Sequence, residues 1–177
     1  MLFRKLNLGD AVQYRSLRLF SLQESPFAFS ESYEDECVKT AEQFHDQFNM
    51  NTSMKGTFIM GAFTNKEELV GFVSIARDTR SKALHKAFLH TMYVTPAYRS
   101  KGIGGKLIMN LRNEIEHLEG LEQIHLWVLL SDYNAVEFYE KAGFIGQGAL
   151  VKQDLKIHGQ YVDAMYMVKY LVNYPGS

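Results

Sequence analysis

The chain has 177 residues, 46% of them hydrophobic and 22% charged, and its 19 Lys and Arg against 20 Asp and Glu give a net charge of -1. These values are typical of a globular protein of one domain, which we expect to span residues 1–177. The sequence has neither the roughly 20-residue apolar run of a membrane span nor the apolar block of a signal peptide. Its single Cys37 excludes an internal disulfide and a multi-cysteine zinc site.

We therefore expect a cytoplasmic protein with no metal, no membrane partner and no nucleic-acid partner, because a near-zero net charge disfavours non-specific nucleic-acid binding. The balance nevertheless conceals blocks of like charge. Residues 79–113 contain basic side chains and no acid, residues 114–140 contain acids and neither Lys nor Arg, and residues 24–42 are acidic apart from Lys39. Solvated helix faces are the simplest explanation of such blocks.

The first part of the chain predicts a short strand at Phe3–Leu6 and a helix from its N-cap Asp10 to about Gln23. After Pro26, the stretch Ser30–Phe48 predicts one or two further helical pieces.

Strand-like segments then predominate. The strands are predicted at Thr57–Phe63, at Leu69–Ile75 with an extension to Asp78, and at Lys86–Val94, which ends before Pro96. A polar turn at Thr64–Glu67 joins the first two.

The last part of the chain alternates helices and strands. Glycines 102, 104 and 105 open a helix that runs to about Glu119 and ends at Gly120, and a strand follows at Gln123–Leu130. A short helix capped by Ser131 or Asp132 ends at Gly143, and Phe144–Leu155 and Tyr161–Tyr170 form a final hairpin through His158 and Gly159.

This order of elements predicts an α/β fold with a mixed sheet and helices on both faces. The strands Lys86–Val94 and Gln123–Leu130 flank one helix as a βαβ unit, so they are expected to be parallel.

The most informative segment is the glycine-rich turn between Val94 and Leu107. The free N–H groups at a helix start, the helix dipole and glycines that allow close approach favour an anion such as phosphate. Leu107 rules out both a P-loop, which needs Ser or Thr there, and a dinucleotide motif begun at Gly102, which needs a third glycine. The alternative is a turn that only packs the helix onto the sheet.

The segment Arg99–Gly104 resembles the R/Q-x-x-G-x-G/A signature of the GNAT superfamily of N-acetyltransferases. Its context is similar too, because Tyr93–Pro96 precedes it and Asn134, Ala135 and the block Phe138–Phe144 follow, the last resembling Y-E-K-x-G-F. The resemblance covers nearly the whole chain. It implies the small bacterial GNAT fold, a mostly antiparallel sheet with one central parallel pair.

The resemblance also implies where acetyl-CoA binds. Its pyrophosphate would contact the Arg99 side chain and the backbone of the turn. By the same resemblance, the strand before the turn would carry a bulge after His90 and separate from the next parallel strand. The pantetheine would lie in that gap and pair with the strand at about Met92–Val94, where an amide would polarise the thioester carbonyl. Asn134 would contact the pantetheine, the alternative being a helix cap. The implied donor-site residues are Met92, Tyr93, Val94, Arg99, Ser100, Lys101, Gly102, Ile103, Gly104, Gly105, Lys106, Asn134 and Tyr139.

Tyr139 is the implied catalytic acid. The thiol of coenzyme A should have a pKa of about 8.5 and tyrosine one of about 10, so a hydroxyl beside the sulfur can donate a proton, or at least a hydrogen bond, to the departing thiolate. The alternative is a core tyrosine beside Val136 on an amphipathic helix.

The general base and the acceptor are less defined. Glu31 and Glu34 are the candidate catalytic carboxylates, with His90 as a third candidate base. The segment Ser25–Glu36 resembles the P-x-A-F region and paired acids of small bacterial relatives, where an acidic, aromatic wall would orient a cationic amine. The alternative is a solvated helix start. The last hairpin, with Tyr161, Tyr166 and His158, could close the other side of that pocket.

The sequence thus predicts an acetyl-CoA-dependent N-acetyltransferase that acts on a primary amine, preferably of a small molecule, by direct attack in a ternary complex. The alternatives are a silent acetyl-CoA-binding module, a protein N-terminal or lysine acetyltransferase, and an enzyme that uses a longer acyl-CoA. The resemblance also allows a homodimer through the apolar C-terminal strand.

Overall fold

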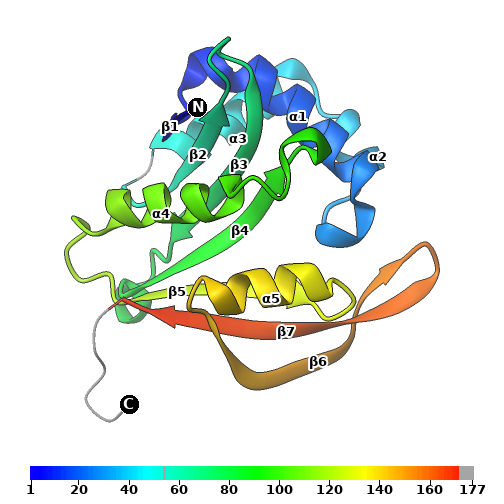
Figure 1. The fold of residues 1–177 in the computed structure, drawn as a ribbon, viewed down its shortest axis with the longest axis vertical. Coiled ribbons are helices and arrows are strands. Elements are labelled where there is room, and N and C mark those ends of the chain that lie inside the picture. The colour runs from blue at the N-terminus through cyan, green and yellow to red at the C-terminus, as the bar shows by residue number, and fades with distance from the viewer. Residues whose placement is uncertain (54, 172–177) are drawn as a thin grey trace.

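The computed structural model describes residues 1–53 and 55–171, in which a seven-stranded sheet carries helices on both faces (Figure 1). In the order β1-β2-β3-β4-β5-β7-β6, neighbouring strands are antiparallel except for β4 and β5. This confirms the predicted mixed sheet and its parallel pair. The strands are β1 (Leu2–Lys5), β2 (Phe58–Phe63), β3 (Leu69–Arg77), β4 (Lys86–Val94), β5 (Gln123–Leu129), β6 (Ile145–Ile157) and β7 (Gln160–Tyr170).

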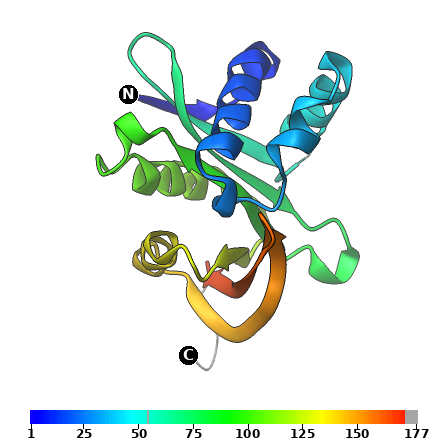
Figure 2. The same cartoon turned by 90° about the vertical axis from the view of Figure 1, so that its right-hand side faces the viewer.

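The helices divide between the two faces of the sheet. Figure 2 shows α1 and α3 on one face and α4 and α5 on the other. Among the described residues, none of the helices has the length and apolar content to cross a membrane. The helices are α1 (Ala11–Glu24), α2 (Tyr33–Cys37), α3 (Ala41–Ser53), α4 (Ile103–Ile115) and α5 (Tyr133–Lys141), and short 3-10 turns occur at Leu8–Asp10, Pro26–Ala28, Ser81–Ala83 and Pro96–Tyr98.

The predicted end of α4 is wrong. The helix stops at Ile115 with Glu116 as its C-cap, and Gly120, with a φ of 72°, lies beyond an intervening turn. Leu118 packs against the core, and Arg77 donates a 2.8 Å hydrogen bond to the carbonyl of Glu119. These tertiary contacts hold residues 116–119 as a turn. The spacing of apolar residues in the sequence does not reveal such contacts.

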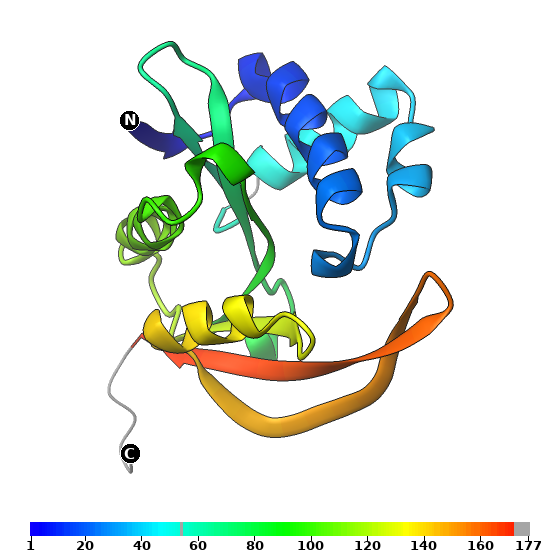
Figure 3. The same cartoon turned by 45° about the vertical axis from the view of Figure 1, so that its right-hand side comes forward.

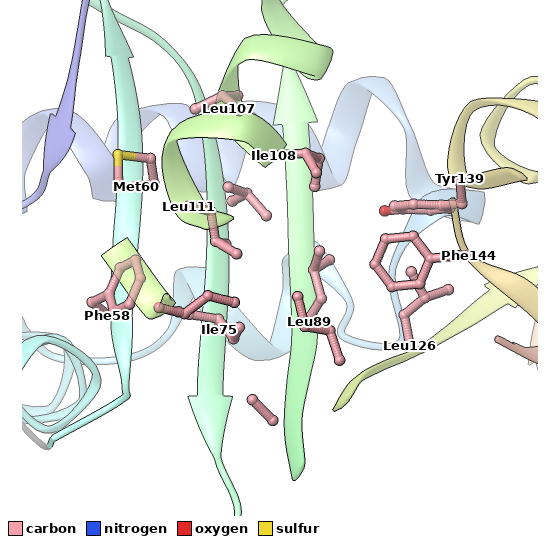
Figure 4. Close-up of a cluster of buried hydrophobic side chains, with 14 of the residues drawn as sticks. Phe58, Met60, Ile75, Leu89, Leu107, Ile108, Leu111, Leu126, Tyr139 and Phe144 are labelled. Carbon is pink, nitrogen blue, oxygen red and sulfur yellow. The ribbon is translucent and has the colours of Figure 1, made fainter. Parts of the chain in front are cut away.

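Two hydrophobic cores lie on opposite sides of the sheet. Leu107, Leu111 and Ile115, spaced four residues apart on α4, are at most 1% exposed and belong to one core cluster with residues of β2, β3, β4 and β5. Figure 4 shows Leu107 and Leu111 within this cluster. On the other face, Tyr14 of α1 and Phe48 of α3 pack near Phe72 of β3. Both cores include residues of β2, β3 and β4, so these three strands are covered on both faces.

The parallel pair β4 and β5 separates soon after it begins. Only Lys86–Phe88 pair with Gln123–His125, and Figure 1 shows the two strands meeting at one end and diverging toward the other. Opposite β3, Ser74 pairs with Thr91 and Ile75 with Leu89, so His90 is the extra residue of a β-bulge. The Ser74 hydroxyl accepts the Thr91 N–H at 3.2 Å, which stabilises the bulge.

The core on the α4 face gives a direct test of the fold. Leu111→Ala should lower the free energy of unfolding by about 2–5 kcal/mol, because a fully buried leucine leaves a cavity when it is truncated. Urea denaturation followed by circular dichroism measures this change. The control is Met109→Ala on the same helix, where the side chain is 54% exposed and the expected change is within about 0.5 kcal/mol. Equal effects of the two substitutions would contradict the assigned packing.

Candidate active site

A cavity of ≈ 680 Å³ opens where β4 and β5 have separated, and we call it the turn cavity. It extends from the end of β4 along the glycine-rich turn to α5. Most of the predicted donor-site residues line it, namely Met92, Tyr93, Val94, Arg99, Ser100, Gly102, Ile103, Gly104, Gly105, Asn134 and Tyr139. The fold therefore collects at one place residues that are far apart in the sequence.

The shape of the turn suits a negatively charged ligand. Ser100 and Gly102 have φ values of 58° and 74°, and such alternation directs successive N–H groups to one concave side. Gly102 is the N-cap of α4, whose 13 residues aim the positive end of their dipole at the turn. A Cβ built on Gly102 or Gly105 meets no atom within 4 Å, so the turn has open space for a phosphate group.

Arg99 is held by partners within the chain. Its Nε donates to the Val94 carbonyl at 2.9 Å, and Nη1 and Nη2 donate to the two carboxylate oxygens of Glu24 at 3.1 and 2.5 Å. The Tyr93 hydroxyl donates to the same carboxylate at 3.0 Å. The hydrogen bond from Arg99 keeps the pKa of Glu24 below its ordinary value. These bonds join the end of α1 to the turn, and the predicted contact of the Arg99 side chain with pyrophosphate stays a prediction.

The two lysines of the turn lie outside the cavity lining. The Lys101 ammonium donates to the Ala97 carbonyl at 2.9 Å and sits 5.3 Å from the centre of the Tyr98 ring. Lys106 lies in the first turn of α4 and contributes its positive charge from there. Their predicted roles in binding also stay predictions.

α5 contributes Asn134 and Tyr139 to the site. Asp132 caps this helix by accepting the Ala135 N–H at 3.0 Å, so the alternative that Asn134 is the cap is wrong. Tyr139 is 9% exposed and packs edge-on against Phe144, with the ring centres 5.6 Å apart. Figure 4 shows its hydroxyl directed away from α5, toward the β4 side. Burial raises the pKa of this hydroxyl, so it is a protonated donor at neutral pH.

A second cavity of ≈ 450 Å³, the central cavity, adjoins the first. Both are lined by Ala28, Met92, Asp132, Ala135 and Tyr139, so Tyr139 lies where the two cavities meet. The outer wall comes from Phe27, which contacts His158 of the last hairpin edge-on at 5.6 Å, and from Trp127 of β5. Figure 3 shows that hairpin, β6 and β7, curving up toward the end of α1.

The bulge residue His90 lines the central cavity and a third, smaller cavity of ≈ 250 Å³, the inner cavity. Partial removal of its imidazole from water lowers the pKa of His90 below its ordinary value of 6.5, while the charge of Glu31 acts in the opposite direction. The ring is therefore neutral at pH 7 and able to accept a proton. Sequence patterns place His90 on a strand, but the bulge depends on the register with β3, which they do not show.

Glu31 and Glu34 do not share a cavity with Tyr139. Glu31 lines the inner cavity and forms a 3.0 Å ion pair with Arg18, and it also lines, together with Glu34 of α2, a separate surface pocket beside His158. Their predicted catalytic roles stay predictions. Sequence reasoning missed Trp127 and Arg18 as lining residues. The alternation along β5 could have placed Trp127 on the open face, but nothing in the sequence pairs Arg18 with Glu31.

Residues 17–144 match the family model of the acetyltransferase (GNAT) family. The chain belongs to this family. As a GNAT protein it is similar to N-alpha-acetyltransferase 50 of Danio rerio, with 26% identity over 140 residues that cover 79% of this chain and 74% of that protein. It is also similar to spermidine N(1)-acetyltransferase of Vibrio cholerae, with 28% identity over 110 residues that cover 60% of this chain and 61% of the relative.

Solved structures share the GNAT fold. A GNAT-family acetyltransferase from Streptococcus pneumoniae superposes with a TM-score of 0.84 at 23% identity, covering 97% of this chain and 99% of that one. A GNAT phosphinothricin acetyltransferase from Sinorhizobium meliloti, solved in complex with acetyl-CoA, has a TM-score of 0.83 at 18% identity. The match covers 99% of this chain and 91% of that one. Family membership makes this chain an acyltransferase. No group of His, Cys, Asp and Glu side chains in the described part of the chain is arranged to hold a metal ion.

The glycine at the start of α4 provides a test of the turn as a binding site. Gly102→Ala should raise the Kd for acetyl-CoA about tenfold or more, because a φ of 74° strains any residue with a Cβ by about 1 kcal/mol or more and displaces the amides. Isothermal titration calorimetry measures the affinity. Gly148→Ala is the matched control, since Gly148 has a φ of 69°, equally open surroundings and a place on the distal β6. An equal loss of affinity in both variants would contradict the assignment.

Proposed function

We propose that this GNAT protein transfers the acetyl group of acetyl-CoA to the primary amine of a small molecule by direct attack within a ternary complex. The observation that carries the proposal is that the three cavities lie next to one another and share lining residues. Tyr139 lines the turn and central cavities, and His90 lines the central and inner cavities. A donor on the α4 side and an acceptor on the α1 side can therefore meet at the opening between β4 and β5.

The donor half of the site fits acetyl-CoA. The turn offers free amides and open space for the pyrophosphate, and β4 beyond Phe88 lacks a β5 partner in the described sheet. Unpaired strand groups favour an extended ligand with amides of its own, such as pantetheine. The structural neighbour from Sinorhizobium meliloti, solved with acetyl-CoA, supports this placement.

The residues at the cavity junction supply the proton transfers. His90, neutral at pH 7, accepts the proton that the amine loses as its nitrogen bonds to the thioester carbonyl carbon. An amide of the Met92–Val94 segment stabilises the negative charge that develops on the carbonyl oxygen. Tyr139 donates its proton to the sulfur as the carbon–sulfur bond breaks. The products are the N-acetylated amine and free coenzyme A.

The acceptor half of the site favours a small molecule. The inner cavity has a volume of ≈ 250 Å³, and the contact of Phe27 with His158 bounds the central cavity on its outer side. The relative from Vibrio cholerae is named after a small amine, spermidine, whereas the relative from Danio rerio is named as an N-alpha-acetyltransferase. A panel of small amines and short peptides with acetyl-CoA, followed by thiol release, tests the proposal. Binding of acetyl-CoA without turnover of any amine would favour a silent module.

Replacing the proposed acid separates catalysis from binding. Tyr139→Phe should lower kcat about 100-fold or more, the usual contribution of a positioned acid, and leave the Kd for acetyl-CoA nearly unchanged. The ring and its packing against Phe144 are retained in this variant, so folding is expected to persist. Steady-state kinetics and calorimetry measure the two quantities. An unchanged kcat would refute the role of the hydroxyl.

Replacing the proposed base changes the pH profile. In the wild-type protein, kcat at saturating substrates should rise with pH through a pKa below 6.5 and then level off, because His90 must be neutral to accept a proton. His90→Gln should lower the plateau about 100-fold or more and remove this rise. The control is His117→Gln, an exposed histidine near the end of α4, which should keep the wild-type profile. A rise that persists in His90→Gln would assign the base to another group.

A further inference from the structure

The inner cavity is a polar chamber beneath α1, α2 and α3, on the face of the sheet opposite α4. Hydroxyl groups of Tyr14, Ser74 and Thr91 contribute to its lining, with Arg18 and Glu31. Ser74 and Thr91 are bonded to each other through their hydroxyls at 2.7 Å. Phe44, Phe48, Phe58 and Ile75 supply apolar lining beside these polar groups, and such mixed walls suit a small ligand that carries both polar and apolar parts.

Arg18 stands out among the lining residues. Its side chain is 7% exposed, and its described hydrogen bond is the one from Nη2 to a carboxylate oxygen of Glu31 at 3.0 Å. The guanidinium carbon lies 4.4 Å from the centre of the Phe29 ring. Nη1 is buried and has no hydrogen-bond partner among the described residues. A guanidinium has five N–H donors, and leaving one buried without an acceptor destabilises a protein, so this arrangement needs an explanation.

The nearby acids do not provide the missing acceptor. Glu31 already accepts from Nη2, and Glu36, the other acid that lines the chamber, pairs with Lys39 at 2.7 Å. A planar carboxylate matches the planar guanidinium of an arginine, and one of its oxygens can accept the hydrogen bond that Nη1 lacks. A doubly charged phosphate fits less well, because Glu31 and Glu36 would repel it.

We infer that the acceptor is a small amine that also carries a carboxylate, of the amino-acid class, and that Arg18 binds this carboxylate. The inference rests on the proposed function, which it narrows. A ligand anchored at Arg18 occupies the cavity that His90 shares with the central cavity, so its amino group can face both the base and the thioester. Arg18 is thus a specificity-determining residue that takes no part in the proton transfers.

Matched acceptors test the carboxylate directly. Each L-amino acid is compared with its carboxamide and with the amine left after removal of the carboxylate, with acetyl-CoA as donor and thiol release as readout. We expect the best amino acid to exceed both analogues in kcat/KM by about 10- to 100-fold, the usual effect of a charge-assisted hydrogen bond. Amines without a carboxylate that react as well or better would overturn the inference and leave the acetyltransferase function intact.

Substitutions at Arg18 test the residue. Arg18→Gln should abolish the preference for the carboxylate and leave the Kd for acetyl-CoA unchanged, and Arg18→Lys should retain part of the preference. Arg15→Gln is the matched control, because Arg15 lies one turn earlier on α1 and donates to the carbonyls of Cys37 and Lys39, outside the chamber. Thermal melting verifies that each variant is folded. A preference that survives in folded Arg18→Gln would overturn the inference.

A binding measurement gives a readout that does not depend on turnover. The amino acids are titrated by calorimetry into the wild-type protein saturated with coenzyme A, and the same titration is made with Arg18→Gln. Binding to the wild type that weakens about tenfold or more in the variant supports the inference even if catalysis fails. Absence of binding to the wild type, or equal affinity in the two proteins, overturns it.

Discussion

The separation of β4 from β5 is the constraint on which the rest of the structure depends. Backbone N–H and C=O groups need partners, so a parallel pair that stops at Phe88 leaves strand groups free along an opening in the sheet. The bulge at His90 turns β4 away, and the packing of α4 on one face and α1 on the other holds it there. The energetic cost of the opening is offset by these two cores, and the opening is what a strand-like ligand can fill.

Many charged residues form ion pairs with individual partners and do not act only as blocks of like charge. The acidic stretch of residues 24–42 predicts a wall that attracts cations, yet three of its acids already form ion pairs: Glu24 with Arg99, Glu31 with Arg18 and Glu36 with Lys39. The pair of Glu24 and Arg99 ties the end of α1 to the glycine-rich turn, so the wall of the acceptor side and the donor site are mechanically joined. In the acidic block of residues 114–140, Glu114 pairs with Lys5 and Glu137 with Lys141 on exposed surfaces, which fits solvated faces.

Much of the fold can be predicted from the sequence because its signals are local. Pro96 and alternation define Lys86–Val94, and the glycine-rich turn announces both α4 and an anion site. The end of α4 could not be predicted, because Arg77 and Leu118 hold the following turn through contacts distant in sequence. The family resemblance implies a bulge in this strand, but its position at His90 and the burial of Arg18 beside Glu31 emerge only when strands and helices are assembled. The proposed donor half of the site is thus formed mainly by residues close together in the sequence, whereas the proposed acceptor half is formed by contacts between residues distant in the sequence.

The position of the cavities also bears on the order of the chemistry. The turn cavity opens on the face of α4 and α5, and the inner cavity lies beneath α1 and α3 on the opposite face, with His90 and Tyr139 at the passages between them. Neither ligand has to leave before the other arrives, because each occupies its own side of the sheet. Such an arrangement supports direct transfer over a covalent acetyl-enzyme, and Cys37, the single cysteine, is not among the residues that line the three cavities. In the proposed mechanism a base on one side of the thioester takes a proton from the amine and an acid on the other gives one to the sulfur, and proton exchange with solvent then restores both groups.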